Sequence, residues 1–578
     1  MYTGGDRLHL PSQILSREEL EAEIRVMENR NFLVEEVTEY FTSGYKEKRD
    51  CFATVYNYLI SDKPQSKVCA LFGLRRTGKT VLMEQCAESL PDEEKEKAII
   101  ITCLQGANMY EVLDFVNKKI ENGYKYFFID EITYADNFQQ IGESLANYCV
   151  ELKGARIVIS GTDSLGISLP TANTQFCRSI MVHTTYISFA EYSRITGCNS
   201  IDEYIQKGAI LEPDEFSNYY SVHRYIDTAI SDNLINSLER SEGLDKFQMA
   251  LTEIYEHNEL KNAIERIVNK YSQDLSAKAI RKEFKSGCIT TALGNIVRSK
   301  DNPDNLAVLL KEEQLNKNIA ESLGIIENEK LSVNISEAHK RAIYEYLIEM
   351  DVFVSIPVIS YSDGNEELRN MEMVSHPGMF RANVEHSMSE LSNTENWLPN
   401  ATKEQRERLL SGSYGVALGD IMENFIISDM YRLLCKGKRT SVHNLFQTDE
   451  TKWYVSKLNF KNHEADMIII NKELGEAYLF EIKHSKMNAP EQSYHLENAD
   501  FVEYIENNFG KIKEKAVLYM GKTDISTPVP RINAKDFLVT TYNTVNLLVN
   551  PEEYDINKDI DILLSKENIK DFNEITIG

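Results

Sequence analysis

Eight residues in the N-terminal third have the types and spacing needed to hold a nucleotide phosphate. Residues 73–80 read GLRRTGKT and fit the pattern G-x-x-x-x-G-K-[ST]. Its glycines let backbone N–H groups approach phosphate oxygens, and the following helix N-terminus adds partial positive charge. The residues expected to contact ATP are Gly73, Leu74, Arg75, Arg76, Thr77, Gly78, Lys79, Thr80 and Val81. The motif therefore predicts ATP binding.

Two residues of this loop have separate chemical roles. Lys79 is expected to reach the β- and γ-phosphates, and the Thr80 hydroxyl is expected to ligate Mg²⁺. The motif requires a strand before it and a helix after it. The segments VCALFG and VLMEQCAESL satisfy that requirement. A chance glycine-rich turn is the alternative, and this context argues against it.

An acidic pair follows the loop by fifty residues. The run YFFIDEI places Asp130 and Glu131 at the end of an apolar strand, where a parallel sheet has its nucleotide site. We expect Asp130 to hold Mg²⁺, directly or through water, and Glu131 to act as general base for the attacking water. A helix-capping Asp after a core strand is the alternative interpretation.

A further strand, RIVIS, ends beside a candidate γ-phosphate sensor, Thr162. Arg178 and Arg194 are candidates for stabilising charge in the transition state. Solvated arginines are the more common outcome for such residues.

Three charged residues near the C-terminus are expected to converge. In EADMIIINKELGEAYLFEIKHSK the turn is centred near positions 473–474, so a hairpin would pair positions whose numbers sum to about 947. Asp466 then lies opposite Glu481, and Lys483 shares the face of Glu481 because strands have a period of two. Two carboxylates and a lysine suit a second divalent metal beside a scissile phosphate.

Two further residues are candidates for this C-terminal site. Glu423 lies on the preceding long helix and adds a third carboxylate ligand, and Gln492 begins the helix after the hairpin. A surface salt-bridge cluster on a retained fold is the alternative, because charged alternation is common on exposed strands.

Short apolar runs that alternate with helical stretches position these residues. Such runs are typical of an α/β fold with a parallel sheet buried on both faces. We expect a P-loop NTPase sheet with a helical lid, a winged-helix segment and a C-terminal α/β domain. The expected parts are a helical N-terminal segment (1–60), the ATPase core (61–198), a helical lid or insertion (199–304), a winged-helix-like segment (305–375), the C-terminal domain (405–548) and an acidic tail (549–578).

Composition limits the class of protein and its partners. The 578 residues predict several domains, and the net charge of −27 argues against a non-specific nucleic-acid coat protein. Nine scattered cysteines without a CxxC pair indicate reduced thiols rather than zinc ribbons or disulfides. No apolar run approaches the roughly 18 residues of a membrane span, and the N-terminus lacks the order of a secretory signal. We expect a soluble cytoplasmic protein.

The core motifs together resemble a known family. GLRRTGKTVLM, FFIDEI, ISGTDSL and CRSIMVHTTYISFAEY are similar to the prokaryotic AAA-type ATPases with a G-x-R-R-x-G-K-T loop. The chain departs from their usual Gly-Arg pair at Cys177 and from their Pro-Leu-Ser-Phe-x-Glu stretch at Tyr186 and Ile187. The resemblance implies ATP hydrolysis with Mg²⁺, and it implies oligomers in which a neighbour supplies an arginine. It hardly covers residues 200–300.

Many members of that family carry a restriction-endonuclease-like C-terminal domain. Asp466 followed by Glu481, Ile482 and Lys483 resembles the PD-(D/E)xK pattern, with Ala465 in place of the proline. The resemblance implies a metal-dependent nuclease acting on DNA, with Asp466, Glu481 and Glu423 as ligands and Lys483 as the catalytic cation.

Three functions follow as hypotheses. The first is an ATPase coupled to a nuclease, and the second is a nucleotide switch whose nuclease-like domain is inactive. The third, a regulator that binds DNA through a winged helix, lacks a basic recognition helix. The acidic balance favours the second, whereas the intact Asp466, Glu481 and Lys483 favour the first.

Overall fold

The computed structural model groups the chain into two compact units. The described residues are 31–62, 67–138, 145–162, 179–240, 246–286, 312–323, 336–362, 364–399, 401–435, 453–488 and 490–547. The first unit comprises Met1–Gly73, Gly78–Thr184 and Glu239–Glu242, and the second comprises Leu74–Thr77, Thr185–Leu238 and Gly243–Gly578. Among the described helices, none is both long and apolar enough to span a membrane.

The first unit contains a six-stranded sheet in the order β1-β3-β4-β5-β2-β6. Neighbouring strands are parallel, except that β1 is antiparallel to β3. The strands are β1 (Phe32–Glu36), β2 (Val68–Phe72), β3 (Ala98–Cys103), β4 (Tyr126–Asp130), β5 (Arg156–Gly161) and β6 (Ser179–His183). A sheet rich in parallel strands fits the predicted P-loop NTPase fold.

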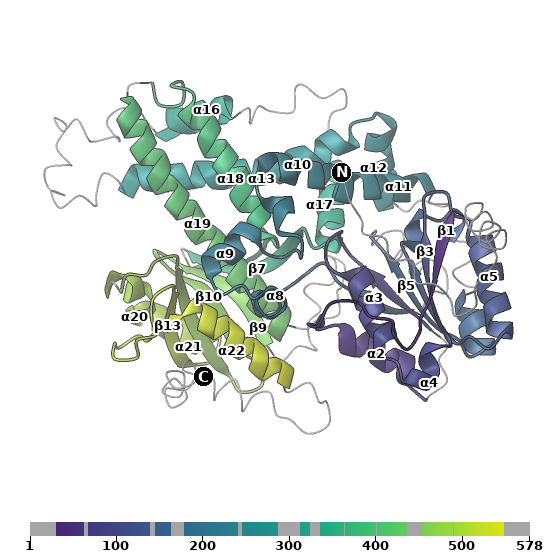
Figure 1. Ribbon diagram of the computed structural model, residues 1–578. Helices are drawn as coiled ribbons and strands as arrows, with labels where there is room; N and C mark the ends of the chain where they lie inside the picture. The colour runs from purple at the N-terminus through teal and green to yellow at the C-terminus, as the bar shows by residue number, and fades with distance from the viewer. Residues whose placement is uncertain are drawn as a thin grey trace, which may run out of the picture. The chain divides into compact units, whose positions relative to one another are not determined.

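Helices cover both faces of this sheet (Figure 1). Successive strand residues point to opposite faces, so two separate cores form. One contains Ile99, Ile101 and residues of α5 (Met109–Glu121), and the other contains Leu71 and residues of α2 (Phe52–Ile60) and α3 (Lys79–Glu88). The near-continuous apolar strands of the sequence follow from this double burial.

The N-terminal segment differs from our prediction. We expected a helical segment over residues 1–60, but β1 occupies Phe32–Glu36 and turns follow it. Phe32 pairs with Cys103, and Phe32 is buried where Leu33 is exposed, as on a half-covered edge strand. The sheet edge therefore determines the conformation of this polar segment. Residues 1–30 lie outside the described residues.

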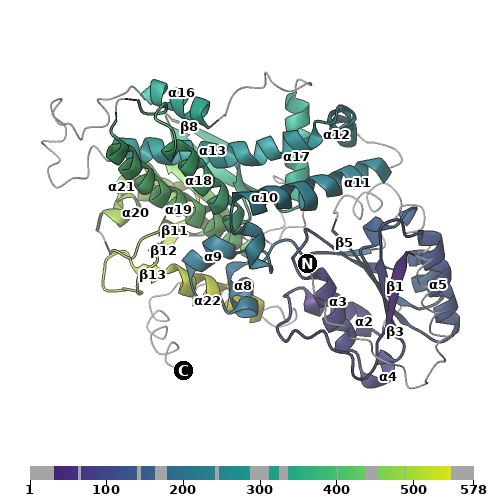
Figure 2. The same ribbon diagram turned by 45° about the horizontal axis from the view of Figure 1, so that its top comes forward.

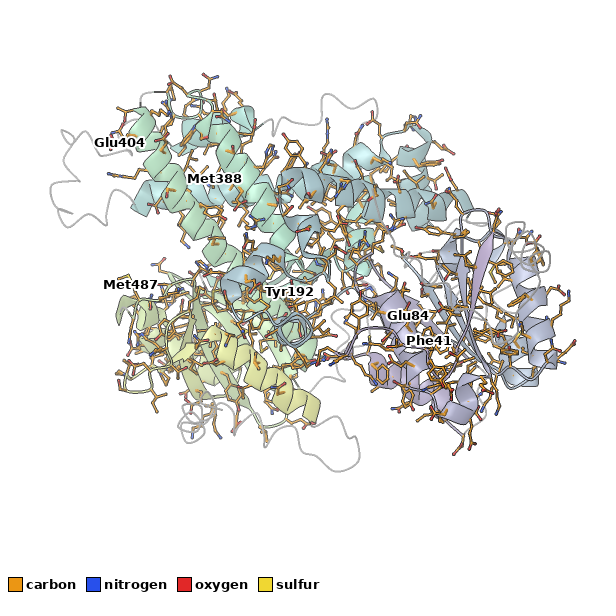
Figure 3. The ribbon with its side chains drawn as sticks, viewed as in Figure 1. Phe41, Glu84, Tyr192, Met388, Glu404 and Met487 are labelled. Carbon is orange, nitrogen blue, oxygen red and sulfur yellow. The ribbon has the colours of Figure 1, made fainter. Side chains whose placement is uncertain are left out.

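The second unit combines a group of helices with a second sheet (Figure 2). Its helices include α8 (Phe189–Thr196), α9 (Ile201–Lys207), α10 (Tyr219–Tyr225), α11 (Asp232–Arg240), α12 (Lys246–Glu256), α13 (Leu260–Ser286), α16 (Glu312–Ser322), α17 (Glu337–Glu349), α18 (Pro377–Ser392) and α19 (Lys403–Leu434). Within the described residues the segment 199–286 is helical, as its sequence pattern predicts. Tyr192 of α8, labelled in Figure 3, packs edge-on against Tyr204 of α9 at 5.3 Å between ring centroids.

The second sheet has seven strands in the order β13-β12-β11-β10-β9-β7-β8. They are β7 (Phe353–Ser362), β8 (Asn365–Val374), β9 (Trp453–Phe460), β10 (His463–Asn471), β11 (Glu476–Lys483), β12 (Lys511–Tyr519) and β13 (Arg531–Asn533). Strands β9, β10 and β11 form an antiparallel meander, and β12 joins β11 in parallel after α20 (Tyr494–Glu497) and α21 (Ala499–Asn508). A final helix, α22 (Ala534–Leu547), follows β13.

The strands predicted as the wing of a winged helix belong to this sheet. The antiparallel hairpin β7–β8 lies at its edge, because β7 pairs in parallel with β9, with Val358 opposite Lys457. We predicted separate segments at 305–375 and 405–548, but hydrogen bonds join their strands into one sheet. The continuous part of the first unit ends at Thr184, so α8 belongs to the second unit. The predicted tail at 549–578 lies outside the described residues.

The long helix α19 begins with a reciprocal cap. The Thr402 hydroxyl accepts from the Gln405 N–H, and the Gln405 side chain accepts from the Thr402 N–H. Glu404, labelled in Figure 3, adds a carboxylate to the first turn, where the helix dipole favours negative charge. Glu423 lies within this helix.

Candidate functional site

The phosphate-binding loop connects β2 to α3 through unusual backbone angles. Gly73 has φ of 144° and Gly78 has φ of 83°, values that side-chain-bearing residues rarely adopt. Lys79 is buried, and its Nζ donates to the Gly73 carbonyl at 2.9 Å. The lysine side chain therefore folds back to the first residue of the loop.

A chain of oxygen atoms connects the loop to the ends of two central strands. The Thr80 hydroxyl donates to Asp130 Oδ2 at 2.6 Å, and the hydroxyl of Ser160 donates to Asp130 Oδ1. Hydroxyl and carboxylate oxygens are the ligands that Mg²⁺ prefers. Sequence reasoning missed Ser160, although its position at the end of the apolar strand RIVIS was a usable signal.

The predicted base and sensor also meet. Glu131 has a left-handed φ of 50°, and the Thr162 hydroxyl donates to Glu131 Oε2 at 3.2 Å. The left-handed conformation turns the carboxylate away from the line of β4, and the hydrogen bond restricts its orientation. The structure thus brings Thr80, Asp130, Glu131 and Thr162 to one end of the first sheet, as predicted.

Negative charge is concentrated at this end of the sheet. Burial, with the carboxylates of Glu35 and Asp130 nearby, raises the pKa of Glu84 to about 7. Glu84 lies on α3, where Figure 3 labels it. Since clustered carboxylates favour a cation, the oxygen donors at Thr80 and Asp130 fit a bound Mg²⁺.

The tip of the loop, Leu74–Thr77, groups with the second unit and is held there by several contacts. The Tyr225 hydroxyl donates to the Arg75 carbonyl at 2.8 Å. Arg76, in a left-handed conformation, lies 3.5 Å from Glu215 and 3.9 Å from Glu212. The predicted nucleotide contacts Arg75 and Arg76 are thus tied to residues that follow α9 in the chain.

The two predicted arginines have different outcomes. Arg178 lies outside the described residues, as does the segment after Thr162. Arg194 lies in the last turn of α8, in the second unit.

The C-terminal triad forms as the register predicted. Met467 pairs with Phe480 and Asn471 with Glu476, both sums being 947. Lys483 Nζ lies 3.0 Å from Asp466 Oδ2 and 2.5 Å from Glu481 Oε2. The Ile482 N–H also donates to Asp466 Oδ2 at 2.7 Å.

Burial and mutual charge perturb all three groups. Burial and the Asp466 charge raise the pKa of Glu481 to about 8. Burial alone would raise the pKa of Asp466, but Lys483 and Lys457 outweigh it and hold that pKa below its ordinary value. Burial would lower the pKa of Lys483, but the two carboxylates raise it. Two unlike carboxylates beside one lysine form an arrangement typical of functional sites.

One oxygen of this triad is available for a ligand. Glu481 is 1% exposed, and among the described residues no hydrogen-bond donor reaches its Oε1. A buried carboxylate oxygen without a donor is costly unless something else binds it. The donor set, Glu481 with the Asp466 carboxylate, fits a hard divalent cation.

Glu423 and Gln492 are the two further residues that we predicted for this site. Glu423 contacts Lys457 of β9, and the charge of Lys457 in turn acts on Asp466. Gln492 lies in the short turn η6 (Pro490–Ser493) before α20. Sequence reasoning missed Lys457; its signal was a lone lysine in the strand WYVSKLNF.

Comparison with known proteins concerns the segment that contains the first of these sites. Residues 65–193 match the family model described as AAA domain. None of the curated proteins matches the chain. A solved structure, the S. cerevisiae Hsp104-ADP complex, is similar over 72% of this chain at 12% identity, with a TM-score of 0.24. This chain covers 52% of that one, about half its length. By its loop, its acidic strand end and this family match, the segment 65–193 is similar to AAA-type P-loop domains.

Proposed function

We propose that this chain couples ATP hydrolysis in its first unit to metal-dependent cleavage of DNA by the β9–β12 domain of its second unit. The observation that carries the nuclease half is the convergence of Asp466, Glu481 and Lys483 at the buried end of the β10–β11 hairpin. The ATPase half rests on the loop and the family match of residues 65–193.

In the ATPase reaction each residue has one role. Lys79 binds the β- and γ-phosphates, while Thr80 and Asp130 hold Mg²⁺. Glu131 accepts a proton from the attacking water, and Thr162 orients the Glu131 carboxylate through the hydrogen bond of 3.2 Å. An arginine from a neighbouring copy of the chain would stabilise the transition-state charge, so an oligomer is part of the proposal.

In the nuclease reaction Asp466 and Glu481 hold a divalent cation, with Glu423 as a further carboxylate nearby. When bound, such a cation polarises a phosphate oxygen and lowers the pKa of a coordinated water. Lys483 would position the attacking water or contact the scissile phosphate. The net charge of −27 confines DNA contact to this local site.

Coupling between the two reactions has a physical basis in the loop itself. Residues 74–77 group with the second unit, where Tyr225 and Glu215 contact them. A nucleotide bound to the loop would therefore act on the same backbone atoms that these residues hold.

A second candidate is a nucleotide-dependent switch with an inactive nuclease-like domain. It is favoured by the acidic charge and by Lys483, which already forms an ion pair with each of the two carboxylates. In that case the C-terminal domain would bind a partner without cutting it.

One experiment separates the two functions. ATP turnover is measured for the wild type, Lys79→Ala and Glu131→Gln, with and without DNA, and DNA cleavage is measured in Mg²⁺ or Mn²⁺. The coupled nuclease requires cleavage that disappears in Glu481→Gln but persists in Glu503→Gln, which removes an exposed glutamate of α21. ATP turnover without any cleavage in the wild type would favour the switch. Absence of turnover in the wild type would refute the ATPase assignment.

A further inference from the structure

Three potential metal ligands meet in the second unit, in residues that the proposed function does not use. His223 lies on α10, Asp227 lies in the π-helical segment η4 (Ile226–Ser231), and Glu265 lies on α13. One ligand atom from each lies within 4.8 Å of the other two, a spread that suits coordination of a single ion. In particular, His223 Nδ1 lies 3.2 Å from Glu265 Oε1.

Local backbone structure accounts for this meeting. His223 and Asp227 are four residues apart, so a continuous helix places them on one side. The helix α10 passes directly into η4, and such π-helical turns are frequent at functional sites because they alter which side chains align. Figure 2 shows α10 beside α13, and residues of α13 and η4 are in contact.

The surroundings hold the candidate ligands in place. Asn269, one turn after Glu265 on α13, donates to Glu265 Oε1 at 3.1 Å and also hydrogen-bonds the Tyr219 hydroxyl. The Tyr219 ring is parallel to the His223 ring, with an interplanar angle of 5°. Outer partners of this kind orient metal ligands and are a recurrent part of metal sites.

The charges at this place are unbalanced without a cation. Within the described residues, Asp227 forms no salt bridge with a lysine or an arginine, although it is half-buried and lies beside a second carboxylate. His223 Nδ1 is buried and forms no hydrogen bond of acceptable geometry. A simple His–Glu ion pair would not require an oxygen of Asp227 within 4.8 Å of both partners.

We propose that His223, Asp227 and Glu265 bind a first-row divalent transition-metal ion of the Zn²⁺ class. One imidazole nitrogen and two carboxylate oxygens are typical ligands of such ions, whereas Mg²⁺ and Ca²⁺ prefer oxygen alone. Three protein ligands leave one position for water or an added ligand. The ion joins α10 and η4 to α13, and α10 also carries Tyr225, which donates to the Arg75 carbonyl.

The test is titration of the full chain with Zn²⁺ by calorimetry in the presence of a reductant, with every protein carrying Glu481→Gln. Asp227→Asn and Glu265→Gln keep side-chain size and remove one ligand charge each, and His223→Ala removes the nitrogen. His257→Ala is the matched control, because His257 is exposed and its Nδ1 contacts the carbonyl of Glu253 in the preceding helix, α12.

We expect one saturable Zn²⁺ site whose affinity falls at least tenfold in each of the three ligand variants and is unchanged in His257→Ala. Zn²⁺ should also raise the midpoint of thermal unfolding in the control but not in Asp227→Asn. A site that survives all three substitutions, or a chain without saturable Zn²⁺ binding, would overturn the proposal. If Zn²⁺ binding is lost in His223→Ala and Glu265→Gln but is complete in Asp227→Asn, the three-ligand geometry is overturned.

Discussion

Glu481→Gln should stabilise the second unit above about pH 5 while removing the proposed metal site. Glu481 is buried, and its pKa is raised from the ordinary 4.5 to about 8 by burial and by Asp466. Between these values the folded chain keeps a proton that the unfolded chain has released. The stability of the wild type therefore falls as pH rises through this window, whereas a glutamine does not titrate.

The magnitude follows from the width of the pH window. Each pH unit between the two pKa values costs about 1.4 kcal/mol, so between pH 5 and pH 7 the wild type loses at most about 3 kcal/mol relative to Glu481→Gln. Asp466 has a lowered pKa, so its contribution to stability is complete at every pH above the ordinary pKa of an aspartate. Lys483 has a raised pKa, so its contribution to stability is complete at every pH below the ordinary pKa of a lysine. Neither group changes protonation between pH 5 and pH 7, so the difference isolates Glu481.

The chain offers a convenient assay for this prediction. Its two tryptophans, Trp397 and Trp453, both lie in the second unit, so tryptophan fluorescence during urea unfolding reports on that unit. Unfolding free energies of the wild type, Glu481→Gln and Glu503→Gln would be measured in EDTA at pH 5, 6 and 7. Glu503→Gln, an exposed change on α21, should track the wild type at every pH.

The outcome that contradicts this reasoning is specific. If the difference between Glu481→Gln and the wild type stays constant from pH 5 to pH 7, the carboxyl is not held protonated by its surroundings. Lower stability of the variant at pH 7 would mean that the contact between Lys483 and Glu481 stabilises the fold more than burial of the charge destabilises it.

Three other predictions concern single residues. Trp397→Ala should lower the unfolding free energy by about 3–5 kcal/mol, because the side chain is fully buried and its Nε1 donates to the Leu391 carbonyl at 2.8 Å. Fluorescence of the remaining tryptophan gives the midpoint of urea unfolding, and an unchanged midpoint would contradict the packing argument. Thr162→Val should reduce kcat for ATP about tenfold with little change in KM, because it removes the donor to Glu131; steady-state kinetics decide, and a change confined to KM would assign Thr162 to binding instead. Burial lowers the pKa of His376 to about 4, so the unfolding free energy of the wild type should fall by about 1.4 kcal/mol per pH unit from pH 6.5 toward pH 4. His376→Phe should be less acid-sensitive. Equal acid sensitivity of the two proteins in urea titrations would refute this.

The local chemistry of both sites could be read from the sequence. The phosphate loop and Asp130 with Glu131 depend on short-range order, because strand, loop and helix succeed one another without a break. The position of Asp466 opposite Glu481 followed from a tight turn and the two-residue period of strands, and the observed pairing of Met467 with Phe480 agrees. In each case the spacing along the chain sets the geometry.

The tertiary structure decided what depends on distant partners. Phe32 begins a strand rather than a helix because the edge of β3 was available for pairing, and the hairpin β7–β8 joins the second sheet because β9 lies beside β7. The meeting of His223 with Glu265 needs two helices to pack, although the residues are 42 positions apart. Sequence pattern determines local conformation. Which strands pair and which helices pack together depends on the energies of contacts between distant segments, and residue spacing along the chain does not encode those contacts.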